Sequence, residues 1–299
     1  MAAPSSPPFL PRSDMIIAHT IPELRAALAG RGRPAFVPTM GNLHAGHIAL
    51  VRQAVPLGDV TVASIFVNRL QFLPHEDFDS YPRTWDSDCA QLTAAGCDVL
   101  FAPREADLYP EPQTFKVAPD PALADLLEGH FRPGFFTGVC TVVMKLFSAV
   151  FFGSGAGGGT ALFGKKDYQQ LMVIRRMVQQ FALPIDVVAG DTARAVDGLA
   201  LSSRNGYLSA EDRQRAVQLS QALRQLAQAV RSSGADPLPA LEAQALKDLS
   251  ALGWQPDYLT VRRRADLQAP GDAAALDGPL VALGAARLGG TRLIDNLEF

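Results

Sequence analysis

The sequence has few of the features that mark a secreted, membrane-spanning or disulfide-bonded protein. Its three cysteines, Cys89, Cys97 and Cys140, show no CxxC spacing and leave an odd thiol in any pairing scheme. This usage is typical of buried thiols in a reducing compartment. No run of about eighteen uncharged apolar residues occurs, and the first residues lack a basic stretch followed by an apolar one. We therefore expect a cytoplasmic protein without a membrane span.

An excess of positive charge is also absent. Lys and Arg number 27 against 30 Asp and Glu, for a net charge of −3, which gives no reason to expect nucleic acid or a membrane as partner. The HExxH, zinc-binding, GxxxxGK[ST] and GxSxG patterns are missing too, so metalloprotease, zinc, P-loop and α/β-hydrolase classes lack support. The expected partners are small molecules.

Hydrophobic residues, at 48% of the chain, are ample for a large core. Short apolar runs typical of buried strands lie at Ala35–Pro38, Val60–Val67, Val99–Ala102, Ala161–Phe163 and Ile185–Ala189. Helical patterns lie around them at Pro22–Ala29, Ala45–Val55, Asp86–Ala95, Pro121–Leu127, Val139–Phe152 and Asp167–Phe181. This alternation predicts an α/β fold with a doubly wound parallel sheet, which binds ligands at the carboxyl ends of its strands.

The chain divides into three parts by pattern. Residues 1–14 are rich in Pro and Ser and are expected to form a flexible tail. Residues 15–190 carry the strand–helix alternation. Residues 191–299 change to two helices, at Ala210–Arg231 with Ser209 as its cap and at Pro237–Leu252, followed by short strands at Asp257–Arg262, Leu280–Leu283 and Arg292–Asn296. This last part predicts a smaller α+β domain with an antiparallel sheet.

The segment PTMGNLHAGH, residues 38–47, follows a predicted strand and opens a predicted helix. Free backbone N–H groups and the helix dipole attract phosphate at such a point. His44 and His47 are three residues apart and share a face of the first helical turn. A lone HxxH is more often a capping residue and a surface histidine, but the strand context and the two glycines favour a phosphate-binding turn.

Two further segments carry groups suited to phosphate. FGKKD, residues 163–167, places two of the chain's five lysines after a strand, where a lysine can neutralise phosphate oxygens and a leaving pyrophosphate. A solvated Lys-Lys pair is the alternative. LSSRN, residues 201–205, gathers hydroxyls and a guanidinium near the domain boundary and could close over a triphosphate. It is an equally plausible polar linker when taken alone.

Gln71 and Gln170 are expected to project above the sheet, where neutral amides can hold a carboxylate without an ion pair. Taken alone, either is more often an ordinary surface glutamine. Asp86 and Asp88 are weaker candidates for holding hydrated Mg²⁺, since carboxylates on a helix surface usually bind no metal.

Several blocks of this chain resemble the pantoate–β-alanine ligase family of the nucleotidyltransferase superfamily with its HxGH motif. The similar blocks, which span Met15 to Phe299, are PTMGNLHAGH, SIFVNRLQF, EDFDSYPRT, LEGHFRPGFFTGV, FGKKDYQQLMVIRRMV, DGLALSSRNGYLS and ARLGGTRLIDN. The resemblance implies a Rossmann-like domain with a C-terminal lid domain, and a homodimer. It also implies ATP-dependent condensation of (R)-pantoate with β-alanine through a pantoyl adenylate, releasing AMP and pyrophosphate.

The resemblance also implies a set of site residues. His44, His47 and Lys166 would be catalytic, Gln71 and Gln170 would bind pantoate, and Asp88 is the candidate for Mg²⁺. The residues expected to bind ATP are Met40, Gly41, Asn42, Leu43, His44, Ala45, Gly46, His47, Gly164, Lys165, Lys166, Asp167, Ala193, Leu201, Ser202, Ser203 and Arg204.

Three positions depart from the family pattern. Arg69 stands where proline is usual, Phe135 where histidine is usual, and Gly153–Gly159 forms a longer glycine-rich loop. Two other functions therefore stay open: a nucleotidyltransferase that leaves AMP on its product, and a non-catalytic nucleotide-binding protein with a decayed site.

Overall fold

The computed structural model describes residues 14–72, 78, 83–153, 155, 157–232, 238–271 and 278–299. The predicted flexible tail therefore lies outside the described residues except for Asp14, as do Ser154 and Ala156 of the glycine-rich loop and Pro237 of a predicted helix.

A parallel sheet of six strands forms the N-terminal part of the molecule. Its strands are β1 (Ile16–Ala18), β2 (Pro34–Thr39), β3 (Val60–Ile65), β4 (Val99–Phe101), β5 (Gly159–Gly164) and β6 (Ile185–Gly190). They lie in the order β1-β4-β3-β2-β5-β6, and every pairing is parallel. All five predicted strands are present. The edge strand β1 was not predicted, because three residues are too short to show a strand pattern.

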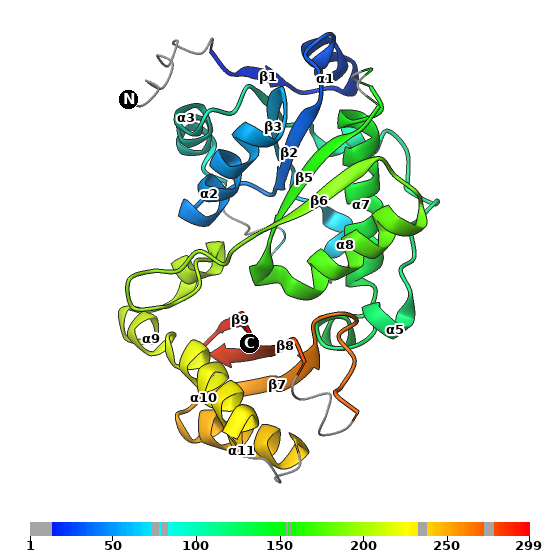
Figure 1. The fold of residues 1–299 in the computed structure, drawn as a ribbon. Coiled ribbons are helices and arrows are strands. Elements are labelled where there is room, and N and C mark those ends of the chain that lie inside the picture. The colour runs from blue at the N-terminus through cyan, green and yellow to red at the C-terminus, as the bar shows by residue number, and fades with distance from the viewer. Residues whose placement is uncertain are drawn as a thin grey trace, which may run out of the picture.

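Helices cover both faces of this sheet (Figure 1). On one face α2 (Ala45–Ala54) and α3 (Trp85–Ala95) pack against the strands through one apolar cluster. On the other face α1 (Ile21–Leu28), α7 (Phe135–Val150) and α8 (Tyr168–Gln180) bury a larger cluster. The doubly wound α/β prediction is confirmed.

The order of the strands reverses at β2. From β2 the chain runs to β3 and β4 on one side of the sheet, while β5 and β6 lie on the other. Helices that leave such a point on opposite faces open a crevice at the carboxyl ends of the strands. The ends of β2 and β5, at Thr39 and Gly164, flank this crevice.

The connecting helices differ from the prediction in length. The helix expected at Pro121–Leu127 is the single turn α5 (Pro121–Ala124), followed by α6 (Glu128–Phe131). Leu127 separates the two with a positive φ of 50°, which a helix cannot contain. Helix α7 begins four residues before its predicted start, after Gly134 in the left-handed region. A further short helix, α4, spans Glu105–Leu108.

The C-terminal part is a three-stranded antiparallel sheet covered by helices on one face (Figure 1). Its elements are α9 (Ala210–Arg215), α10 (Gln218–Ser232), α11 (Leu238–Ala251), β7 (Gln255–Arg263), β8 (Leu280–Leu288) and β9 (Thr291–Glu298). The antiparallel sheet and the Ser209 cap, which accepts from the Asp212 N–H at 3.0 Å, agree with the prediction. The single helix expected at Ala210–Arg231 is instead two helices, and no Gly or Pro marks the break.

Candidate functional site

The turn after β2 is held in shape by a buried carboxylate. Gly41 and Asn42 have positive φ values of 81° and 49°. The carboxylate of Asp88, which is 2% exposed, accepts from the N–H groups of Asn42 at 2.8 Å and Leu43 at 2.9 Å. It also accepts from the Thr84 hydroxyl at 2.9 Å. Asp88 therefore satisfies two backbone donors of the turn and fixes the approach to α2.

The two histidines of the turn form a reciprocal cap. His44 is the N-cap of α2, and its Nδ1 accepts from the Gly46 N–H at 3.2 Å. The Nδ1 of His47 accepts in turn from the His44 N–H at 3.3 Å, and the ring centroids are 4.1 Å apart. A neutral imidazole that accepts at Nδ1 carries its proton on Nε2. Each ring therefore presents an Nε2–H donor.

Both imidazoles are neutral at pH 7. Burial, followed by the charge of Lys166, lowers the pKa of His44 to about 4. Burial lowers the pKa of His47 to about 3, with further contributions from His44 and Lys166. The pair can therefore donate hydrogen bonds to an anion without carrying charge of its own, and a bound phosphate would shift both pKa values upward.

The two adjacent lysines have different partners. Lys165 Nζ forms ion pairs with Asp191 at 2.9 Å and Glu298 at 3.0 Å. Lys166 Nζ makes no ion pair with the residues that the structure describes, and its side chain lines a cavity. The Nδ2 amide of Asn296 donates to the main-chain carbonyls of both lysines, at 2.9 and 2.8 Å. The fold thus uses Lys165 to join the domains, whereas Lys166 lines the cavity.

The LSSRN segment contacts the turn directly. The Ser203 hydroxyl donates to the Asn42 carbonyl at 3.2 Å. Leu201 donates its N–H to the Ala193 carbonyl at 2.9 Å, so these two residues also lie together. Residues 203–207 form a 3-10 helix that Ser202 caps by accepting from the Arg204 N–H. The histidine turn and the LSSRN segment, some 160 residues apart in sequence, therefore lie side by side.

Gln71 is positioned by residues that the sequence did not single out. Its Nε2 donates to the sulfur of Met40 at 3.1 Å, and its Oε1 accepts from Asn68 Nδ2 at 3.2 Å. Asn68 is itself 1% exposed and accepts from the Tyr109 hydroxyl at 3.0 Å. Arg132 donates to the Gln71 carbonyl at 3.2 Å. The signal available in the sequence was a polar residue, Asn68, directly after the apolar run at Val60–Val67.

Gln169 and Gln170 face opposite environments. Gln169 is buried and satisfies the backbone around α6, accepting from the Glu128 N–H and donating to the carbonyls of Leu123 and Leu126 at 2.7–2.9 Å. Gln170 lines the same cavity as Gln71. The structure therefore places Gln170 at the cavity wall, and its contact with a ligand stays a prediction.

A cavity of about 240 Å³ brings most of the predicted residues together. Its lining includes Met40, His44, Gly46, His47, Gln71, Gly164, Lys166, Asp167, Gln170, Ala193, Leu201, Ser202, Ser203 and Arg204. Five of the residues predicted to bind ATP do not line it, namely Gly41, Asn42, Leu43, Ala45 and Lys165, and neither does Asp88. Of these, Asn42, Leu43 and Lys165 make the contacts that hold its walls together.

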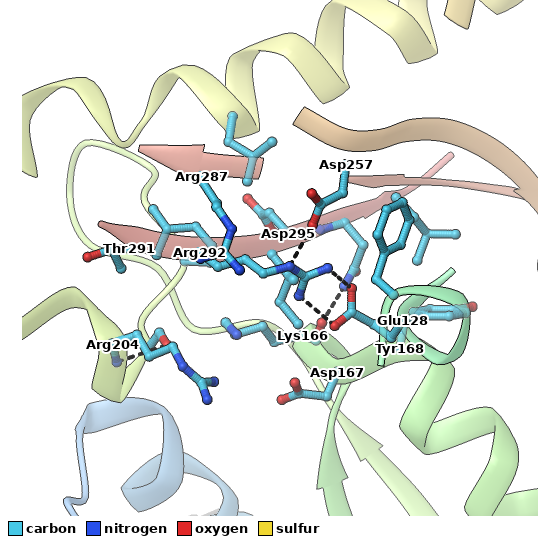
Figure 2. Close-up of a pocket in the computed structure, with 18 of the residues that line it drawn as sticks. Glu128, Lys166, Asp167, Tyr168, Arg204, Asp257, Arg287, Thr291, Arg292 and Asp295 are labelled. Atoms are coloured by element: carbon cyan, nitrogen blue, oxygen red, sulfur yellow. Dashed lines mark hydrogen bonds and ion pairs between the residues drawn. The ribbon is translucent and has the colours of Figure 1, made fainter. Parts of the chain in front are cut away.

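A second cavity of about 400 Å³ lies between the two parts of the molecule (Figure 2). Arg292 of β9 crosses it and forms paired 2.8 Å contacts with Glu128 of α6 and a 2.7 Å contact with Asp257 of β7. The Tyr258 hydroxyl also donates to Glu128, at 2.9 Å. This network was not predicted, because its members are isolated in sequence.

Two of the departures from the family pattern have clear surroundings. Arg69 is directed away from the 240 Å³ cavity, toward Glu105 at 3.6 Å and the ring of Phe78. Phe135 lines both cavities, and the Arg132 guanidinium lies 3.7 Å from the centre of its ring. The first change therefore leaves the cavity wall intact, and the second places an apolar ring where the family has a polar one.

The described residues do not form a metal site of their own. They contain no group of three His, Cys, Asp or Glu side chains placed to hold a cation. Both carboxylate oxygens of Asp88, the sequence candidate for Mg²⁺, already accept hydrogen bonds from the turn and from the Thr84 hydroxyl. Asp88 therefore holds the turn, and its contact with Mg²⁺ stays a prediction.

A doubly wound sheet that ends in a histidine-capped turn, faced by lysine, serine and arginine, defines a nucleotide-binding α/β enzyme of the nucleotidyltransferase type. The family model described as pantoate-beta-alanine ligase matches residues 16–298. The chain therefore belongs to the pantoate–β-alanine ligase family, and it joins pantoate to β-alanine with ATP as co-substrate. The ligase activity leaves no place for an AMP-retaining transferase or a non-catalytic protein.

Relatives and solved structures agree with this assignment. The chain is 76% identical to the pantothenate synthetase of Paracidovorax citrulli and 73% to that of Verminephrobacter eiseniae, covering 95% of this chain and 100% of each relative. The pantothenate synthetase structure from Thermus thermophilus is 42% identical, with a TM-score of 0.86 over 95% of this chain and 99% of its own. A Francisella tularensis pantoate-beta-alanine ligase, complexed with β-γ ATP and β-alanine, is 31% identical with a TM-score of 0.72, covering 95% and 97%. No described helix is long and apolar enough to cross a membrane.

Proposed function

We propose that the chain makes pantothenate through a pantoyl adenylate formed in the 240 Å³ cavity. The observation that carries this is the meeting of the histidine turn, the FGKKD segment and the LSSRN segment with two neutral glutamines in one cavity. A carboxylate oxygen of (R)-pantoate attacks the α-phosphorus of ATP, and pyrophosphate leaves. The amine of β-alanine then attacks the activated carbonyl, loses a proton and displaces AMP.

The charge that develops on pyrophosphate is met by preorganised donors. Lys166 supplies a positive charge from one wall, and Arg204 supplies a guanidinium from the facing wall. His44 and His47 supply neutral Nε2–H donors whose direction is fixed by their Nδ1 contacts. Fixed donors stabilise developing charge without reorganisation, and the loss of one typically costs about a hundredfold or more in kcat.

Gln71 and Gln170 are the proposed pantoate ligands. An amide binds hydroxyl and carboxylate groups but leaves the carboxylate oxygen more nucleophilic than an ion pair would. Asn68 Nδ2 donates to the amide oxygen of Gln71 at 3.2 Å. This contact directs the amide nitrogen of Gln71 toward Met40, at the cavity wall. The substrate would therefore lie beside the end of β2.

Mg²⁺ is proposed to arrive with ATP, coordinated by its phosphates and water, the usual arrangement for this ion. We assign it no ligand among the described residues. Residues 15–190 are proposed as the nucleotide- and pantoate-binding domain and residues 191–299 as a lid that closes over the triphosphate. A cytoplasmic location and a homodimer complete the proposal; the reduced cysteines support the first of these, and the resemblance to the family supports the second.

Exchange of labelled pyrophosphate into ATP tests this mechanism. With pantoate present and β-alanine absent, the wild-type protein should exchange label, because adenylate formation is reversible until the amine attacks. Other hydroxy acids should support little exchange. A protein that makes pantothenate but shows no pantoate-dependent exchange under these conditions would refute the adenylate route.

A further inference from the structure

Two arginines stand directly opposite each other on the β8–β9 hairpin. Arg287 of β8 pairs with Arg292 of β9 in the antiparallel register. Directly opposite residues project from the same face of a sheet, and like charges there are destabilising. The hairpin therefore holds an unfavourable pair unless each charge has a partner.

The two arginines differ in their partners. Arg292 is neutralised by Glu128 and Asp257 at 2.7–2.8 Å. The side chain of Arg287 is exposed, and it makes no hydrogen bond or ion pair with any residue that the structure describes. A guanidinium kept without a partner beside a second one is a candidate for binding an anionic ligand.

The side chain of Arg287 faces the N-terminal domain. Since Arg292 reaches Glu128 of α6 from the same face of the hairpin, that face is directed at the cavity between the domains. Arg287, Lys166 and Arg204 all line this cavity (Figure 2). They come from β8, the turn after β5 and the 3-10 helix after Ser202, so three separate elements bring cations to one space.

The charges that line this cavity favour an anion. Five basic and four acidic side chains contribute to the lining. Three of the acidic ones are already paired: Glu128 and Asp257 with Arg292, and Asp295 with Arg194 from outside the lining. Asp167 is left as the single carboxylate without an ion pair among the described lining residues. The lining therefore carries a net charge of +1, and neither Lys166 nor Arg287 makes an ion pair with a described residue.

This cavity is continuous with the proposed nucleotide cavity. Lys166, Asp167, Gln170, Ser202 and Arg204 line both. A chain of phosphates that begins beside the histidines in the smaller cavity can thus extend past Lys166 into the larger one.

We propose that the two terminal phosphates of ATP reach from the histidines and Lys166 of the smaller cavity into the interdomain cavity, and that Arg287 is the ligand the C-terminal domain contributes to them and to released pyrophosphate. This inference rests on the proposed function, since it needs the nucleotide in the smaller cavity. It gives the C-terminal sheet a direct contact with the leaving group, in addition to the Glu128–Arg292 contact that joins the domains.

The test compares ATP with AMP, because AMP lacks the two terminal phosphates. Arg287→Gln should raise the Kd for ATP and the KM for pyrophosphate in the exchange reaction about tenfold, the equivalent of one charge-assisted hydrogen bond. The Kd for AMP should stay within about twofold. Arg287→Lys keeps the positive charge but loses the paired N–H donors of the guanidinium, so its Kd for ATP should lie between those of the wild type and Arg287→Gln. Arg224→Gln is the matched control on the exposed side of α10, outside both cavities, and should change neither.

Two outcomes would overturn the inference: unchanged ATP and pyrophosphate binding in Arg287→Gln, or equal weakening of ATP and AMP. The second result would show that Arg287 acts on the structure of the domain and not on the terminal phosphates. If Arg287→Gln fails to fold, Arg287→Lys decides by the same comparison. A wild-type protein without pantoate-dependent exchange would refute the proposed function, whereas the ATP-versus-AMP comparison would still decide the role of Arg287.

Discussion

Arg292 and Glu128 join the two domains through a buried, two-pronged contact, with both N–O distances at 2.8 Å. Burial by itself raises the pKa of Glu128, but hydrogen bonds and charge from Arg292 outweigh it, so the pKa lies below its usual value. Glu128 also accepts from Tyr258, and its own N–H is held by Gln169, the neighbour of Gln170. The contact thus connects the C-terminal sheet to the wall that carries a proposed pantoate ligand.

Removing the charge of Glu128 should destabilise the folded protein. Glu128→Gln replaces a buried charged partner of Arg292 with a neutral one and leaves Asp257 to balance the guanidinium, and weakening hydrogen bonds to a charged group costs about 1.5–3 kcal/mol. The measurement is the free energy of unfolding in urea. Asp197→Asn breaks the more exposed pair with Arg213 and is the control, with an expected cost well below that of Glu128→Gln because solvent screens exposed ion pairs. Similar losses in both variants would contradict a special role for the buried contact.

Substitutions at His47 should distinguish the roles of its two ring nitrogens. Asn places an acceptor near the Nδ1 position and keeps the cap on the His44 N–H, whereas Gln places a donor near Nε2. If the Nε2–H donates to phosphate, His47→Gln should keep more kcat than His47→Asn, and His47→Ala should lose about a hundredfold or more. Steady-state rates with saturating ATP check this order. The reverse order would assign His47 to capping alone.

The histidine pair should make the stability of the free protein depend on pH. Both folded-state pKa values, about 4 and about 3, lie below the ordinary histidine pKa of about 6.5. The unfolded chain therefore binds more protons between these limits, so this contribution is complete above pH 6.5 and is lost as the pH falls toward 3. Urea titrations across this range should show a slope of up to about 1.4 kcal/mol per pH unit for each histidine. His44→Gln and His47→Gln should flatten it.

Asp88→Asn should damage the phosphate-binding turn without changing the requirement for Mg²⁺. The amide NH₂ cannot accept from Asn42 or Leu43, so one backbone donor loses its partner. We expect a higher KM for ATP and an unchanged midpoint for activation by Mg²⁺. A large rise in that midpoint would restore Asp88 as a metal ligand.

Adjacent glutamines should give opposite phenotypes. If Gln170 binds pantoate, Gln170→Ala should raise the KM for pantoate with little effect on stability, because Gln170 lines the cavity. Gln169→Ala should lower stability by about 1–3 kcal/mol, since Glu128, Leu123 and Leu126 lose buried hydrogen-bond partners. Kinetics and urea unfolding on both variants check the pair. A pantoate KM that changes only in Gln169→Ala would contradict the assignment of Gln170.

Much of the fold followed from local pattern. Buried parallel strands show as short apolar runs, so β2 to β6 were predicted within a few residues. The break between α9 and α10 was not, because no Gly or Pro occurs there and Ala216 is fully buried in the cluster of the C-terminal domain. Leu127 with its positive φ likewise carries no signal in sequence.

The sequence by itself determined the fold class, the histidine turn and most of the polar side chains that line the cavity, because strand periodicity and turn chemistry are local. Only the tertiary structure decided which member of each neighbouring pair lines the cavity. Lys165 is held by Asp191 and Glu298, whereas Lys166 lines both cavities. Asp88 holds a turn 45 residues away in sequence, and Arg287 and Lys166 line the same cavity between the domains. These assignments depend on long-range contacts that form only when the chain has folded.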